Sequence, residues 1–261
     1  MRDFHPGIVA AGLERALPGT PVKWGWVELP QGAGDLHPVA LARRLEKPVF
    51  RAEVGDRLTQ AKSGADASLV LLPAVLGIEN SAAVVGDLSK AVGAPISEIP
   101  LPPPSIPGLR LAHRLRRNLP HVECLLGARV TGHQRDGERV TAVHAGATEL
   151  RANAFVLASG GLLGMGLIAE GLHVREPIFG LPVETPDPGD VKLWAAPRLV
   201  VQPFVKVGVR VDRTLRPAGW QNLYVCGRTL AGYDPYTEGC GGGVAIATGW
   251  RAGSLAGGAQ P

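Results

Sequence analysis

The stretch "GYDPYTEGCGGGVAIATGW", Gly232 to Trp250, places a cluster of glycines directly before an apolar run with helical spacing. Five of the six residues from Gly239 to Val244 are Gly or Cys. The first N–H groups of a helix lack intrahelical partners and carry partial positive charge, so they bind anions and carbonyl oxygens. Glycine removes the Cβ atoms that would hold a ligand away from these donors. The stretch therefore predicts a helix whose N-terminus either seats an electron-rich ligand or allows a tight crossing between strand and helix.

Two apolar segments that precede this helix have the character of buried strands that end in glycine. They are "NAFVLASGG" (Asn153 to Gly161) and "NLYVCG" (Asn222 to Gly227). Nearer the start, "ADASLVLLPAVLG" (Ala65 to Gly77) contains a continuous apolar run typical of a strand buried on both faces. A helix is expected after it over Ser81 to Gly93, with Ser81 as N-cap and Gly93 as C-cap. This β-then-α order predicts parallel-sheet units and an α/β fold.

Other segments give weaker local signals. We expect a helix in "MRDFHPGIVAAGLERAL" and another over His37 to Glu46, and a strand over Val22 to Leu29. "RDGER" (Arg135 to Arg139) carries the Asp-Gly pair of a tight hairpin. The helix after the proline-rich segment "PLPPPSIPG" places three arginines on one face, which either hold a phosphate or face solvent: Arg110, Arg114 and Arg117.

Composition narrows the class of protein. The 261 residues are 45% hydrophobic and 19% charged, which is ordinary for a globular protein. The net charge of +4 is spread along the chain without a basic stripe, which argues against nucleic-acid binding. No window reaches eighteen apolar residues, so no membrane span is expected. Three widely spaced cysteines and scattered histidines predict neither a disulfide framework nor a metal site: Cys124, Cys226 and Cys240.

Three pieces in order resemble the two-domain FAD oxidoreductases of the fumarate-reductase-like branch. They are the strand ending in "LASGG", the segment "VGVRVDRTLRP" (Val207 to Pro217) and the strand ending in "YVCG". Strands of this kind approach the flavin in that branch. The resemblance implies that their glycines lie close to a flavin.

A narrower resemblance covers nearly the whole chain. "NLYVCGRTLAGYDPYTEGCGGGVAIATG" is similar to the C-terminal signature of the B-subunit family of anaerobic glycerol-3-phosphate dehydrogenases. "ASGGLLGMGLIAE", "VREPIFGLPV", "LRPAGWQNLY", "LPPPSIPGLRL" and "LLPAVLG" are similar to the same family in the same order. The fold this implies is the C-terminal part of a two-domain flavoprotein, with a three-layer parallel-sheet flavin domain and a mixed α+β substrate domain. Residues 1–150 would be mixed α/β, substrate-type and intervening; residues 151–261 would belong to the flavin domain, interrupted by an insertion at about 170–205.

The family opens with a strand and a G-x-G-x-x-G turn that binds the ADP part of the cofactor, and no such turn occurs in this sequence. We therefore expect a chain truncated at its N-terminus. A misassigned start, a split gene or a loss of cofactor binding would each explain this. An N-terminal flavin-binding segment, in cis or in trans, would complete the site.

The resemblance implies oxidation of sn-glycerol 3-phosphate to dihydroxyacetone phosphate, with electrons passing through FAD or FMN to a quinone. The expected partners are the A and C subunits of the dehydrogenase, of which the C subunit carries iron–sulfur clusters. The expected location is the cytoplasmic face of the membrane, held there through those partners. Two alternatives stay open. The chain is a non-catalytic assembly subunit or inactive fragment of that complex, or another flavin oxidoreductase of the fumarate-reductase-like branch.

For the cofactor, the resemblance implies close approaches by Gly160 and Gly161 at the first strand end and by Gly227 at the second. The backbone N–H groups of three helix-start glycines would face the ring carbonyl: Gly241, Gly242 and Gly243. Many relatives of the broader fold carry an acid after the second strand to bind the ribityl chain, and this sequence has Arg228 there. That difference weakens the expectation of standard FAD geometry and leaves FMN as an alternative.

Four further residues are candidates with two interpretations each. Asp234 caps a turn or holds a ribityl hydroxyl. Cys240 has a thiol pKa lowered by the helix N-terminus, or is a small residue among glycines. Arg175 binds the substrate phosphate or forms a surface ion pair. His173 is the one histidine close to these motifs in the sequence and the candidate base for the substrate hydroxyl proton.

Overall fold

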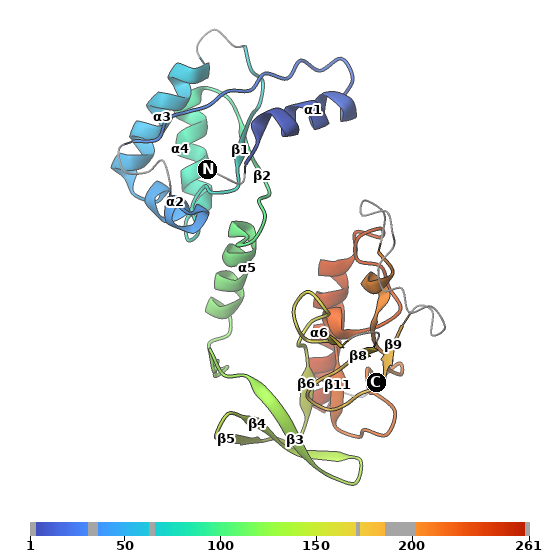
Figure 1. Cartoon of the computed structure of the whole chain (residues 1–261). Helices are drawn as coiled ribbons and strands as arrows, with labels where there is room; N and C mark the ends of the chain where they lie inside the picture. Colours follow the sequence, from blue (N-terminus) through green and yellow to red (C-terminus); the bar gives the residue numbers. More distant parts are fainter. Residues whose placement is uncertain (1–3, 31–35, 63–65, 171–172, 186–201, 259–261) are drawn as a thin grey trace. The chain divides into compact units, whose positions relative to one another are not determined.

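The computed structural model describes residues 4–30, 36–62, 66–170, 173–185 and 202–258 (Figure 1). The chain forms two compact units, Met1–Glu123 and Cys124–Pro261, and each is described by itself. The boundary expected from the sequence between the substrate-type region and the flavin domain lies at residue 150. That functional boundary stays a prediction. Much of the insertion predicted at about 170–205 lies outside the described residues.

The first unit is built on a parallel β-α-β element. Strand β1 (Val70–Pro73) leads through helix α4 (Ser81–Val92) to strand β2 (Ile96–Ile99), and the two strands pair in parallel with Val70 opposite Ile96. Gly93 ends α4 in the left-handed conformation, with φ of +65°, where glycine is favoured. The parallel-sheet unit and its C-cap are therefore confirmed, whereas the N-cap position of α4 is Asn80 and not Ser81.

Four more helices belong to the described part of this unit: α1 (Pro6–Ala16), α2 (Pro38–Leu45), α3 (Pro48–Lys62) and α5 (Ile106–Arg117). Helix α3 lies beside α4 (Figure 1), and a Cβ on its Gly55 would lie only 3.0 Å from the Ala91 Cβ. Buried side chains from the helices and from the loop after β1 form the core, among them Leu41, Leu45, Leu76, Val84, Leu88 and Ile106.

The structure differs from the sequence-based expectations for two segments of this unit. Val22 to Leu29 forms no strand; Trp24 and Trp26 are exposed, and the Trp24 ring lies 3.3 Å from where a Cβ on Gly7 would stand. Of the α5 arginines, Arg110 forms an ion pair with Glu98 and donates to the Gly77 carbonyl, and Arg117 pairs with Glu79 at 2.6 Å. These two guanidinium groups already have anionic partners.

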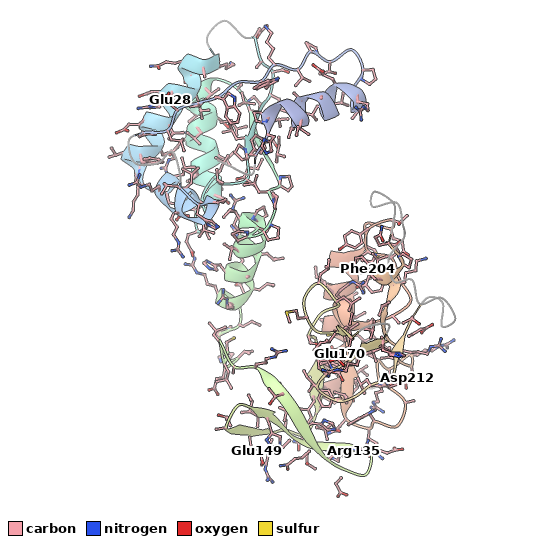
Figure 2. All side chains as sticks on the ribbon, viewed as in Figure 1. Glu28, Arg135, Glu149, Glu170, Phe204 and Asp212 are labelled. Carbon is pink, nitrogen blue, oxygen red and sulfur yellow. The ribbon has the colours of Figure 1, made fainter. Side chains whose placement is uncertain are left out.

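An antiparallel sheet opens the second unit. It consists of β3 (Val130–Asp136), β4 (Arg139–Ala145) and β5 (Thr148–Arg151). Gly137, with φ of +55°, makes the tight turn of the predicted "RDGER" hairpin. Charged side chains such as Arg135 and Glu149 line this sheet (Figure 2).

The predicted glycine-ended strands pair with each other. Strand β6 (Phe155–Leu157) and strand β11 (Leu223–Val225) are parallel, with Leu223 opposite Phe155, and helix α6 (Gly241–Ala256) packs against both (Figure 1). Helix α6 buries the side chains of Ala252 and Leu255. The opening stretch thus forms the helix that its sequence predicts.

The remaining elements of the second unit are short. They are β7 (Ile168–Glu170), β8 (His173–Arg175), β9 (Val183–Glu184), the 3₁₀ helix η1 (Pro203–Lys206), β10 (Gly208–Val209) and the 3₁₀ helix η2 (Gly227–Thr229). The apolar segment from Leu199 to Asp212 forms no long strand in its described part, because Pro203 cannot donate to a strand ladder and starts η1 instead. Residues 199–201 lie outside the described residues. In the described ranges no sheet exceeds three strands, and every helix is too short or too polar to span a lipid bilayer.

A buried amide joins the antiparallel sheet to the parallel pair. Asn222, immediately before β11, accepts a hydrogen bond from the Val140 N–H at 2.8 Å and donates to the carbonyls of Val140 and Asn153, both at 2.9 Å. The side chain is 4% exposed, so water cannot replace these partners.

We predict that Asn222→Ala lowers the free energy of unfolding by about 2–4 kcal/mol, because it leaves buried backbone groups without partners. Urea denaturation of the purified variants measures this. Gln221→Ala, at an exposed neighbouring position, serves as the control and should change little. Equal unfolding midpoints for the two variants would contradict the role given to Asn222.

Candidate functional site

The glycine-rich ends of β6, β11 and α6 are fastened together by two threonine hydroxyls. Thr229 Oγ1 accepts a hydrogen bond from the Gly160 N–H at 3.1 Å and donates to the Gly160 carbonyl at 3.2 Å. Thr248 Oγ1, on α6, accepts from the Gly227 N–H at 2.9 Å. The structure therefore brings together three segments that the sequence predicted to meet at one site.

Helix α6 begins at Gly241 with an uncapped N-terminus. Cys240 is its N-cap residue and makes no side-chain cap hydrogen bond, and the first intrahelical bond runs from the Val244 N–H to the Cys240 carbonyl. The N–H groups of the glycines in between have no intrahelical acceptor. A helix start of this kind attracts anions and carbonyl oxygens.

The space over these glycines distinguishes the two explanations for them. A Cβ on Gly242 or Gly243 would meet no described atom within 4 Å, so packing within the described part of the chain does not require glycine at either position. Close packing occurs next to them instead, where a Cβ on Gly241 would lie 3.2 Å from the Pro235 Cβ. A tight crossing between strand and helix therefore does not explain Gly242 and Gly243.

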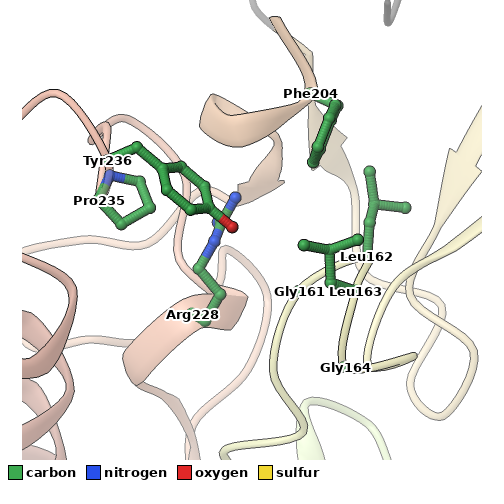
Figure 3. Close-up of a pocket in the computed structure, with 8 residues that line it drawn as sticks. All are labelled: Gly161, Leu162, Leu163, Gly164, Phe204, Arg228, Pro235 and Tyr236. Atoms are coloured by element: carbon green, nitrogen blue, oxygen red, sulfur yellow. The ribbon is translucent and has the colours of Figure 1, made fainter. Parts of the chain in front are cut away.

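A pocket of about 200 Å³ lies beside Gly161 (Figure 3). Arg228 and Tyr236 extend into the same space, and Phe204 faces them from the other side (Figure 3). A Cβ on Gly161 would lie 3.0 Å from the Arg228 Cγ, so glycine is needed for this approach. The complete lining is Gly161, Leu162, Leu163, Gly164, Phe204, Arg228, Pro235 and Tyr236.

The sequence predicted Gly161 and Arg228 in the site but missed Phe204, Pro235 and Tyr236. Pro235 and Tyr236 belong to the quoted "GYDPYTEG" loop, so their proximity to the glycines was the available signal. Phe204 comes from η1 and carries no such signal. An adjoining apolar pocket of about 270 Å³ shares Phe204 and has the lining Leu162, Leu163, Met165, Leu167, Ile168, Ala169 and Phe204.

Backbone carbonyls fix the Arg228 guanidinium. Its Nη1 donates to the Val207 carbonyl at 3.3 Å, its Nη2 donates to the Val205 carbonyl, and the group stands over the Tyr233 ring at 5.6 Å. Burial raises the pKa of the Tyr233 hydroxyl, and the positive charge of Arg228 opposes that rise. Within the described ranges Arg228 forms no ion pair with a carboxylate.

Asp234 is buried and caps a turn. Its Oδ1 accepts from the N–H groups of Tyr236 and Thr237, both at 3.0 Å, and its Oδ2 accepts from the Thr237 hydroxyl at 2.7 Å. These hydrogen bonds, led by that from the Thr237 N–H, hold the pKa of the Asp234 carboxyl below its usual value. The turn-cap role is therefore present, and contact with a ribityl hydroxyl stays a prediction.

The expected low thiol pKa of Cys240 is wrong. Desolvation raises the pKa of the Cys240 thiol, and the Glu238 carboxylate, whose Oε2 lies 3.3 Å from the Sγ, raises it further. A negative neighbour disfavours the thiolate more than the helix N-terminus favours it. A role for Cys240 beside a cofactor stays a prediction.

His173 and Arg175 lie on the β7–β8 hairpin, and neither lines the two pockets described above. Arg175 is exposed and pairs with Glu170 at 2.7 Å, which matches the ion-pair alternative. His173 is exposed and stands opposite Glu170 in the strand register. Their catalytic and substrate roles stay predictions. Among the described residues, no three His, Cys, Asp or Glu side chains gather as a metal site would need.

Known proteins resemble the chain along almost all of its length. It is 34% identical to the B subunit of anaerobic glycerol-3-phosphate dehydrogenase from Yersinia enterocolitica over 94% of the chain, and equally identical to that from Pectobacterium carotovorum. The chain is a homologue of the B subunit of anaerobic glycerol-3-phosphate dehydrogenase.

The B subunit from Vibrio cholerae is 32% identical over 96% of the chain. The chain spans about 60% of the length of these relatives. No protein-family model matches the chain, and no solved structure matches it. The family resemblance seen in the sequence is confirmed.

We predict that Gly166→Ala destabilises the second unit by about 1–3 kcal/mol, as overpacking does. A Cβ there would stand 2.2 Å from the Gly160 carbonyl oxygen and 2.4 Å from that of Ser159, so the loop backbone must move. Chemical denaturation measures the loss. Gly164→Ala is the matched control, because its Cβ would have no contact closer than 3.8 Å. Equal losses for both variants would contradict the steric account.

We predict that Glu238→Gln makes Cys240 react faster with iodoacetamide at a fixed, mildly alkaline pH. The thiolate is the reacting form, and its fraction falls as the thiol pKa rises. Removing the Glu238 charge lowers that pKa, so the profile of alkylation rate against pH shifts to lower pH. Mass spectrometry of the Cys240 peptide follows the reaction. An unchanged or opposite shift would show that Glu238 does not control this thiol.

Proposed function

We propose that this chain supplies the flavin-ring side of a dehydrogenase B subunit that takes part in oxidising sn-glycerol 3-phosphate to dihydroxyacetone phosphate. The observation that carries the proposal is homology over 94% of the chain to proteins named as the B subunit of that dehydrogenase. The open glycine start of α6 supports it independently, because nothing in the described part of the chain requires glycine at Gly242 and Gly243.

The residues fit the ring end of a flavin. The α6 N-terminus offers N–H donors without intrahelical acceptors. Gly161 allows the close approach of Arg228, and Gly160 and Gly227 adopt positive φ angles of +88° and +67°, which glycine tolerates. The buried Ser159 hydroxyl oxygen beside them has no hydrogen-bond partner in the described part of the chain. These groups would hold FAD or FMN by its ring, and such a flavin would accept the hydride from the substrate carbon.

The ADP end of FAD would need other residues. The 261 residues contain no G-x-G-x-x-G turn to receive a pyrophosphate at a helix start. In the proposal, a further segment in cis or in trans supplies that turn. This chain orients the ring and excludes water through the apolar walls formed by Leu162 and Phe204.

The remaining parts of the proposal concern the complex. The A subunit and the iron–sulfur C subunit would share the reaction, and a quinone would receive the electrons. Attachment to the inner face of the membrane would come through these partners. His173 stays the candidate base, and the exposed β7–β8 hairpin that carries it would have to be covered by a partner for that role.

One observation favours a second function, that of a non-catalytic docking subunit. Ile246 and Trp250, one turn apart on α6, are 77% and 75% exposed, and Gly249 lies between them. Large apolar side chains side by side on a helix are typical of a protein–protein contact. In this alternative α6 serves assembly and no flavin is bound.

The test is the visible absorption spectrum of the chain purified after co-expression with the reading frame immediately upstream of its gene. We predict flavin bands that denaturation releases into solution. A colourless preparation that still contains both polypeptides would contradict the proposal and favour the docking function.

We further predict that Gly243→Ala weakens flavin binding at least about tenfold while the chain stays as stable or gains up to about 1 kcal/mol, since alanine favours a helix. Gly249→Ala is the matched control, because its Cβ also meets nothing within 4 Å but lies away from the helix start. It should keep the flavin. Loss of flavin in both variants, or in neither, would contradict the seat at the α6 N-terminus.

A further inference from the structure

Arg228, on the wall of the 200 Å³ pocket, is a cation that pairs with no carboxylate among the described residues. It is half-buried, two backbone carbonyls fix it, and in the described ranges no carboxylate pairs with it. By contrast, the exposed Arg175 and Arg210 each pair with a glutamate at 2.7 Å. A charge removed from water without a partner is costly, so an anion that reaches Arg228 gains more than one that reaches an exposed arginine.

Further donors line the same pocket. The backbone N–H groups of the four consecutive residues 161–164 have no hydrogen-bond acceptor in the described part of the chain, and all four residues line the pocket. The Tyr236 hydroxyl, likewise without a partner there, belongs to a residue that lines the same pocket as Arg228 (Figure 3). Consecutive free N–H groups beside a guanidinium are the donor set that binds a phosphate.

We propose that this pocket binds a phosphate monoester, with its oxygens on the Arg228 guanidinium and the 161–164 backbone. The apolar side chains of Leu162, Phe204 and Pro235 would contact the carbon skeleton. The phosphate belongs either to the small substrate or to FMN. The choice of glycerol 3-phosphate as that substrate rests on the proposed function. In this proposal Arg228, and not Arg175, is the arginine that binds the phosphate. Arg175 already forms an ion pair with Glu170.

The test is isothermal titration calorimetry in phosphate-free buffer, with no flavin present except as a titrant. The titrants are sn-glycerol 3-phosphate, glycerol, FMN and riboflavin. We expect saturable binding of at least one phosphate ester at one site, and weaker or no binding of its partner without phosphate. Glycerol 3-phosphate binding identifies the substrate as the source; FMN binding without riboflavin or glycerol 3-phosphate binding identifies the cofactor.

Variants separate the pocket from general charge. Arg228→Gln should weaken binding about tenfold to a hundredfold, the range for hydrogen bonds between charged groups. Arg228→Lys, which keeps the charge, should lie between wild type and Arg228→Gln. Tyr236→Phe should weaken binding severalfold without disturbing the fold, since its hydroxyl has no partner in the described part of the chain. Arg210→Gln removes an exposed charge and should bind like wild type.

Three results would overturn the proposal. They are equal binding by folded Arg228→Gln and wild type, equal binding of FMN and riboflavin without glycerol 3-phosphate binding, and no saturable binding by the chain or by the chain co-purified with the upstream product. Phosphate binding by a preparation that never holds flavin would contradict the flavin proposal alone. A flavin-bound preparation without a phosphate site would contradict this proposal alone.

Discussion

The hydroxyl of Thr229 holds the second unit together at the point where its function is expected. The side chain is fully buried and satisfies both the N–H and the carbonyl of Gly160, while Thr248 does the same for the Gly227 N–H from α6. Each such bond contributes only about 1 kcal/mol, but a buried backbone group left without its partner costs about 1–3 kcal/mol. These threonines therefore fix the relative positions of two strand ends and a helix start. Arg228 lies on η2 between Gly227 and Thr229, so the hydrogen bonds of these two neighbours also fix its backbone.

The glycines of this region serve different purposes that composition alone does not separate. Gly166 is needed because a Cβ would strike backbone, and Gly161 because Arg228 lies against it. Gly227 adopts a φ of +67°, which few other residues tolerate. A Cβ on Gly242 or Gly243 would meet no atom of the described residues within 4 Å. A glycine that the chain's own packing does not use is the better indication of a ligand, and these two lie at an uncapped helix start.

The elements with strong local signals were predictable from the sequence. The glycine-led helix α6, the "RDGER" hairpin and the β1–α4–β2 unit each have a pattern contained within one short segment. The failures depended on tertiary structure. Val22 to Leu29 has strand-like alternation but no neighbouring strand to pair with in the described ranges, and the helix α3 carries many charged residues, so no apolar period revealed it.

The site was predictable in part for the same reason. The glycines and Arg228 lie on recognisable segments, whereas Phe204 reaches the pocket from a 3₁₀ helix that its sequence does not indicate. The sequence also did not predict which charged groups lie close to one another. Glu170 pairs with Arg175 across a hairpin, and burial together with the Glu238 carboxylate raises the pKa of the Cys240 thiol, because folding sets both surroundings.

Amide hydrogen exchange at Gly241, Gly242 and Gly243 tests the central claim most directly. It would be measured on the chain co-purified with its upstream product, before and after removal of flavin. A flavin seated at the α6 N-terminus should slow exchange at these N–H groups and leave the start of α5 unchanged. Equal exchange in the two preparations, or a preparation that never contains flavin, would contradict the account.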